Sequence, residues 1–66
     1  MMTKLEVARR RRGLRQIDVA NAAGCSESMV AYLEQRKRVP SPDLGKRIAR
    51  AVGLDPARWQ TLQKRG

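Results

Sequence analysis

The chain has 66 residues, enough for one small domain but not for two separate cores. It carries 15 Lys and Arg against 6 Asp and Glu, a formal net charge of +9, which favours polyanionic partners. One cysteine and no histidine exclude an internal disulfide and a zinc site. No apolar run approaches the roughly 20 residues of a membrane span, and no signal-peptide pattern opens the chain.

The basic residues occur along the whole chain rather than on one helix face, so nucleic acid is a better-supported partner than a membrane. A charged surface that is merely solvated is the alternative that composition leaves open. The single cysteine fits a reducing, cytoplasmic location. We expect no metal and no cofactor. We also expect no enzymatic activity, because neither a nucleophile with a base nor a readable acidic pair is present.

Helix-favouring residues dominate, and start and stop signals divide the chain into five short helices. The start signals are a capping box of Thr3 and Glu6, a cap at Ser26, Ser41 followed by Pro42, and Asp55 followed by Pro56. The stops are Gly13, Gly24 and Gly53. The apolar positions expected to face inward on the second, fourth and fifth helices are Val19, Ala20, Ala23, Leu44, Ile48, Ala51, Val52, Trp59 and Leu62.

The second helix, expected from about Gln16 to Ala23, is separated from the third, Glu27 to about Gln35, only by the turn "AGCS". Such a short turn makes two helices meet at a steep angle, as in the helix-turn-helix arrangement, whose second helix enters the major groove of DNA. Helix pairs of this kind also occur in proteins that bind no DNA, so the spacing alone leaves both interpretations open.

The stretch "GLRQIDVANAAGCSESMVAYLEQRKRVPSPDLGKRIARAVGL" resembles the helix-turn-helix domain of the phage repressor and Cro type, also called the xenobiotic-response-element family. The residues that carry the resemblance are Gly13, Leu14, Gln16, Val19, Ala20, Gly24, Ser26, Val30, Leu33, Glu34, Pro40, Ser41, Ile48, Ala49 and Gly53, with Leu5 and Arg9 upstream. The sequence departs from the family at Ala8, where leucine is usual, at Arg15, where a capping residue is preferred, and at Arg36, where glycine is usual.

The resemblance implies an all-α fold, a compact bundle of four to five short helices of the lambda-repressor-like type. Residues 1–66 would form one DNA-binding domain, with the helix-turn-helix at about residues 16–35. It also implies a bacterial or phage transcription regulator. We expect a repressor of phage, mobile-element or restriction–modification type that binds a palindromic double-stranded operator as a homodimer, because one short recognition helix covers only a few base pairs. We expect the dimer seam around residues 54–62.

The third helix has two faces at about 100° per residue. Val30, Leu33 and Glu34 point to one side, while a polar side suits base edges: amide with adenine, hydroxyl with several bases, methyl with thymine. The expected base-reading residues are Glu27, Ser28, Tyr32 and Gln35, and the family's base-reading positions map onto the first three. For Glu27, helix capping is the competing interpretation, since acidic residues favour helix N-termini.

Phosphate contacts are expected from the segments on either side of the third helix. Gln16 matches the family's phosphate-contacting glutamine at a helix N-terminus, where free N–H groups suit an anion, and Arg15 is beside it. The run Arg36, Lys37 and Arg38 follows the third helix, where the chain should pass the DNA backbone. A solvated loop is the alternative for this run.

Glu34 and Arg9 both fall on inward helix faces, four residues after Val30 and Leu5 respectively. A buried charge is costly unless it is paired. The family has an ion pair at these two positions, and the resemblance implies one between Arg9 and Glu34. The alternative is that each charge reaches solvent at a helix edge.

A second class of function is a protein-interaction module, such as an antitoxin that covers a toxin, with exposed Ile17, Met29 and the last helix as its contact surface. A third class, a membrane-active cationic peptide, needs one broad amphipathic face, and five short capped helices do not provide it.

Overall fold

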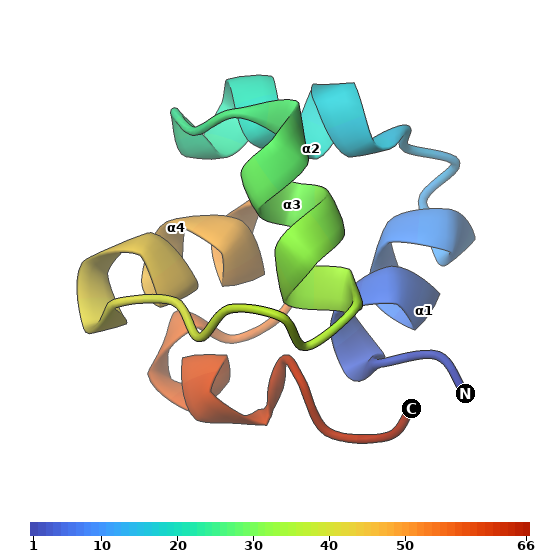
Figure 1. Cartoon of the computed structure of the whole chain (residues 1–66), viewed down its shortest axis with the longest axis vertical. Coiled ribbons are helices and arrows are strands. Elements are labelled where there is room, and N and C mark those ends of the chain that lie inside the picture. The colour runs from blue at the N-terminus through green and yellow to red at the C-terminus, as the bar shows by residue number, and fades with distance from the viewer.

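The computed structural model describes residues 1–66 and consists of five short helices without a sheet (Figure 1). The helices are α1 (Lys4–Arg11), α2 (Gln16–Ala23), α3 (Glu27–Glu34), α4 (Pro42–Ala51) and the 3₁₀-helix η1 (Pro56–Thr61). The predicted all-α class and the number of helices are therefore confirmed. The helices are all too short and too polar to cross a bilayer.

Serine and threonine hydroxyls begin three of the helices. Ser26 Oγ accepts from Met29 N at 3.1 Å, and Ser41 caps α4 in the same way. Thr3 Oγ1 accepts from Glu6 N at 3.1 Å, but the Glu6 carboxylate does not complete the predicted capping box; it lies 2.7 Å from Arg10 Nη2. An oppositely charged group four residues along the same helix competes with the backbone for this carboxylate.

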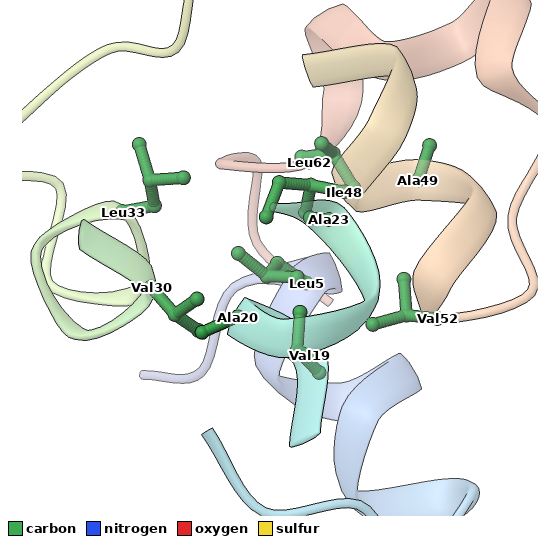
Figure 2. Close-up of a cluster of buried hydrophobic side chains, with 10 residues drawn as sticks. All are labelled: Leu5, Val19, Ala20, Ala23, Val30, Leu33, Ile48, Ala49, Val52 and Leu62. Carbon is green, nitrogen blue, oxygen red and sulfur yellow. The ribbon is translucent and has the colours of Figure 1, made fainter. Parts of the chain in front are cut away.

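The core lies where α1, α2, α3 and α4 face one another, and the C-terminal segment adds Leu62 to it (Figure 2). Its buried residues are Leu5, Val19, Ala20, Ala23, Val30, Leu33, Ile48, Ala49, Val52 and Leu62. The inward positions predicted on α2 are all among them. Leu44, Ala51 and Trp59 are half-buried and pack against this core. Leu62 is 1% exposed, so this residue of the expected dimer seam belongs to the core of the monomer.

The last predicted helix has 3₁₀ geometry, with a non-helical backbone at Arg58 (φ −105°, ψ 23°). This kink lets Trp59 lie on the backbone of α4 at Gly45. A Cβ atom at position 45 would be 2.5 Å from Trp59 Cε3 and 3.2 Å from its Cβ. Gly45 is fully inside α4, where glycine is unfavourable, so the close approach of the indole accounts for it.

The C-terminal segment returns to the start of α1, and the two ends of the chain lie side by side (Figure 1). Lys4 N donates to Lys64 O at 2.7 Å and Leu5 N donates to Leu62 O at 2.9 Å. These N–H groups belong to the first turn of α1 and have no partner within the helix. The C-terminal segment thus completes the cap that Thr3 begins.

Candidate nucleic-acid interface

The turn between α2 and α3 is built on Gly24. This residue has a left-handed backbone (φ 71°), and the next N–H, that of Cys25, donates back to Ala20 O at 3.0 Å. Cys25 is half-buried, and burial raises the pKa of its thiol, so it remains protonated and acts as packing. Ser26 then starts α3 directly. The two helices cross steeply, with α3 standing at the front of the molecule below α2 (Figure 1).

One face of α3 is buried and the opposite face is open. Val30, Leu33 and Glu34 are buried, as the helical spacing predicts. The four predicted base-reading residues are all exposed: Glu27, Ser28, Tyr32 and Gln35. Tyr32 is 40% exposed, and its ring lies under the Arg38 guanidinium, with Cζ 5.9 Å from the ring centroid. This face therefore offers a carboxylate, two hydroxyls and an amide to a ligand, with a cation at its C-terminal end.

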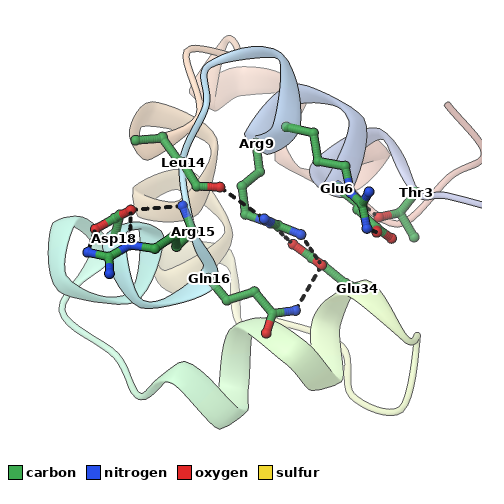
Figure 3. Close-up of polar contacts among 9 residues, drawn as sticks. Thr3, Glu6, Arg9, Leu14, Arg15, Gln16, Asp18 and Glu34 are labelled. Carbon is green, nitrogen blue, oxygen red and sulfur yellow. Dashed lines mark hydrogen bonds and ion pairs between the residues drawn. The ribbon is translucent and has the colours of Figure 1, made fainter.

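Behind this face, Arg9 of α1 and Glu34 of α3 form an ion pair (Figure 3). Arg9 Nε lies 2.6 Å from Glu34 Oε2, and Arg9 Nη2 lies 3.1 Å from Oε1. Arg9 Nη1 also donates to Leu14 O at 2.9 Å. The hydrogen bond to Glu34 raises the pKa of the guanidinium. The pair holds α1, the α1–α2 connection and the end of α3 in one arrangement.

Gln16 takes part in the same cluster, which its sequence position did not indicate. Its Nε2 donates to Glu34 Oε1 at 3.0 Å, and the side chain is half-buried (Figure 3). The amide has two N–H groups and one carbonyl, so one bond to Glu34 leaves further hydrogen-bonding capacity. Gln16 is the first residue of α2, and no backbone partner is present for its own N–H. A phosphate contact by Gln16 is compatible with this geometry.

Arg15 is exposed beside Gln16, but its charge is engaged. Its Nε and Nη2 donate to the two carboxylate oxygens of Asp18 at 3.1 and 3.0 Å. Asp18 Oδ2 also accepts from Arg15 N at 2.8 Å, so Asp18 caps α2 from inside its first turn. The bonds from Arg15 lower the pKa of Asp18, and those to Asp18 raise the pKa of Arg15. Arg15 therefore has less free charge for a ligand than its exposure suggests.

The basic loop, Arg36–Arg38, follows α3 and is exposed throughout. Arg36 has a left-handed backbone (φ 60°), a conformation that glycine adopts more readily than any other residue. Its Nε donates to Gln63 O at 2.8 Å, so part of this guanidinium is bound to the C-terminal segment. Lys37 takes part in no ion pair. Among the three, Lys37 and Arg38 are the freer cations.

The acidic residues are largely occupied, which leaves the surface strongly positive. Four of them lie in ion pairs: Glu6 with Arg10, Asp18 with Arg15, Glu34 with Arg9 and Asp43 with Arg47. The other two, Glu27 and Asp55, lie at the N-termini of α3 and η1. Most of the 15 basic residues consequently have no acidic partner. Such a surface attracts a polyanion at long range.

Two residues that the interaction-module alternative needs as exposed side chains are not exposed. Met29 is half-buried and packs against the core, and Ile17 is half-buried on α2. The prediction of exposure was wrong for both, because each lies at the edge of its helix's apolar stripe rather than opposite to it. The large apolar side chains that the structure leaves exposed are Met1, Met2, Tyr32 and Val39.

A short helix, a glycine turn and a second helix with an open polar face define a helix-turn-helix protein of the DNA-binding class. The chain belongs to the helix-turn-helix domain family, whose model matches residues 3–62. Comparison with curated proteins and with solved structures gave no match.

Proposed function

We propose that this protein is a sequence-specific regulator of transcription that binds double-stranded DNA through α3. The observation that carries the proposal is the open polar face of α3. The Arg9–Glu34 pair lies behind this helix, and the basic loop follows its C-terminal end. A helix of this width fits the major groove. Its family resemblance favours a repressor of phage, mobile-element or restriction–modification type, acting in the cytoplasm.

In this proposal Ser28 and Tyr32 touch base edges, together with Gln35 and, near the helix start, Glu27. All four are exposed on α3. The chain flanks this helix with groups for phosphate: Gln16, backed by Glu34, and the basic loop. Base contacts carry the discrimination, while phosphate contacts fix the position of the protein on the duplex.

We propose a homodimer that reads two inverted half-sites about one helical turn apart, because one eight-residue recognition helix covers only a few base pairs. Because Leu62 is buried, the large apolar side chains that residues 54–62 still offer to a second copy are the half-buried Leu54 and Trp59. Sedimentation of the protein with operator DNA measures the stoichiometry. Two chains per operator are expected, and a single chain at saturation would contradict the dimer.

Selection of bound sites from a pool of random duplexes tests sequence-specific binding directly. We expect enrichment of an inverted repeat whose half-sites share one short motif. The matched control is the same selection with a Ser28→Ala, Tyr32→Ala double variant, which should recover DNA with a weaker motif. Recovery of unrelated sequences by the unmodified protein would show that it is not a sequence-specific regulator.

A further inference from the structure

Gln63 connects the C-terminal segment to the loop that follows the recognition helix. Its Nε2 donates to Leu33 O at 3.1 Å and also to Arg38 O. Its backbone carbonyl accepts from Arg36 Nε at 2.8 Å. Leu33 precedes the basic loop and Arg38 ends it, so a single amide group spans the loop from one end to the other.

The loop has few other restraints. Arg36 N donates to Leu33 O at 3.2 Å and Lys37 N donates to Tyr32 O at 2.9 Å, and both bonds continue the end of α3. After Lys37, residues 38–40 make one hydrogen bond within the chain, the one from Gln63 to Arg38 O. The neighbouring Val39 is 81% exposed, and the first buried residue after the basic loop is Pro40.

A phosphate contact from a mobile loop is weaker than one from an ordered loop, because binding must then supply the ordering free energy. The restraint from Gln63 acts where Lys37 and Arg38 carry free charge. Arg38 also lies over the ring of Tyr32, a predicted base-reading residue. The position of this loop therefore affects the phosphate contacts and the end of the base-reading face together.

We propose that Gln63 is a positioning residue of the DNA-binding surface: it orders the basic loop so that Lys37 and Arg38 meet phosphate groups. The inference rests on the proposed function. It brings the C-terminal segment, distant in sequence from α3, into the binding site. Gln63 itself touches no DNA in this arrangement and acts through the loop.

The test replaces Gln63 with methionine, which keeps the length of the side chain and removes its N–H donors without adding charge. Gln60→Met is the matched control, because Gln60 is exposed on η1 and makes no side-chain hydrogen bond. Two quantities are measured at a temperature where circular dichroism shows both variants folded. They are the hydrogen-exchange rate of the Lys37 amide without DNA, and the salt dependence of binding to a short labelled duplex of arbitrary sequence.

We expect Gln63→Met to speed exchange of the Lys37 amide several-fold and Gln60→Met to leave it unchanged. Lys37→Ala should flatten the salt slope by about 0.9 in the unmodified background, the value for one phosphate contact, and by less than half as much beside Gln63→Met.

If Lys37→Ala changed the salt slope equally in the unmodified and Gln63→Met backgrounds, the role of Gln63 would be refuted and the proposed function would stand. Unaltered exchange of the Lys37 amide in Gln63→Met would do the same. Failure of the unmodified protein to bind the duplex would overturn the proposed function as well, and is thus distinguishable from both results.

Discussion

The guanidinium of Arg9 and the carboxylate of Glu34 meet through two hydrogen bonds, with their side chains only 11% and 4% exposed. Removing either partner leaves the other charge buried and unpaired. We therefore expect Arg9→Ala or Glu34→Ala to lower the free energy of unfolding by about 3–5 kcal/mol. Urea denaturation followed by circular dichroism measures the change.

The control for this prediction is the second ion pair of α1, Glu6 with Arg10, in which the arginine side chain is 61% exposed. Solvent screens this pair, so Arg10→Ala should cost no more than about 0.5 kcal/mol. If Arg9→Ala were as mild as Arg10→Ala, the buried pair would not be the element that holds α1 against α3.

Gly45 is the second site with a clear stability prediction. Alanine favours a helix over glycine by about 1 kcal/mol, but its Cβ would lie 2.5 Å from Trp59 Cε3. We expect the clash to prevail, with a net loss of about 1–3 kcal/mol in the free energy of unfolding. In a Trp59→Ala background the same substitution should be stabilising. Thermal melts of the parent, Gly45→Ala, Trp59→Ala and the double variant measure both effects. A Gly45→Ala variant that is more stable than the parent would refute the packing argument.

Two substitutions at Arg36 distinguish the cost of backbone strain from the loss of a side-chain contact. Both Arg36→Ala and Arg36→Gly remove the bond to Gln63 O, but only glycine accepts φ 60° without strain. We expect the glycine variant to be more stable than the alanine variant by about 1 kcal/mol. Chemical denaturation of the pair isolates this difference. Equal stabilities would mean that the loop changes conformation when the arginine is removed.

Base and phosphate contacts should respond differently to substitution. Ser28→Ala or Tyr32→Ala should weaken binding to the selected operator by about 1–3 kcal/mol and relax preference at one or two positions. Lys37→Ala should weaken operator and scrambled DNA alike and flatten the salt dependence. Binding curves on both duplexes at several salt concentrations provide the measurement. A changed sequence preference in Lys37→Ala, or none in both α3 variants, would show that the roles are wrongly assigned.

Asp18 forms an ion pair with Arg15 and so competes with phosphate for its guanidinium. Substitution of Asp18 should therefore strengthen DNA binding. At neutral pH the carboxylate is ionised, since Arg15 lowers its pKa from an ordinary value that is already acidic. Asp18→Asn keeps an oxygen that can accept from Arg15 N while it removes the negative charge. We expect tighter binding and a salt slope steeper by about 0.9, one further phosphate contact. Filter binding measures both, with Asp43→Asn as control for loss of an exposed acid at an ion pair.

Most of the fold could be predicted because its signals are local. Hydroxyl caps at Thr3, Ser26 and Ser41 satisfy the free N–H groups of helix starts, and left-handed glycines end α1, α2 and α4. The helical repeat then separates the buried from the exposed face of α3. These features depend on residues within four positions of one another, so the sequence alone determines them.

The tertiary structure decided the contacts between distant segments. Gln63 reaches Leu33 and Arg38, and Gln16 reaches Glu34, across separations that no helical period describes. The Asp18 contact was local, and an acid three residues after Arg15 was a signal that sequence reasoning could have used. A side chain with several hydrogen-bonding atoms has many possible partners in the chain. Only the packing of the helices brings one of them within reach and determines which charges stay free for a ligand.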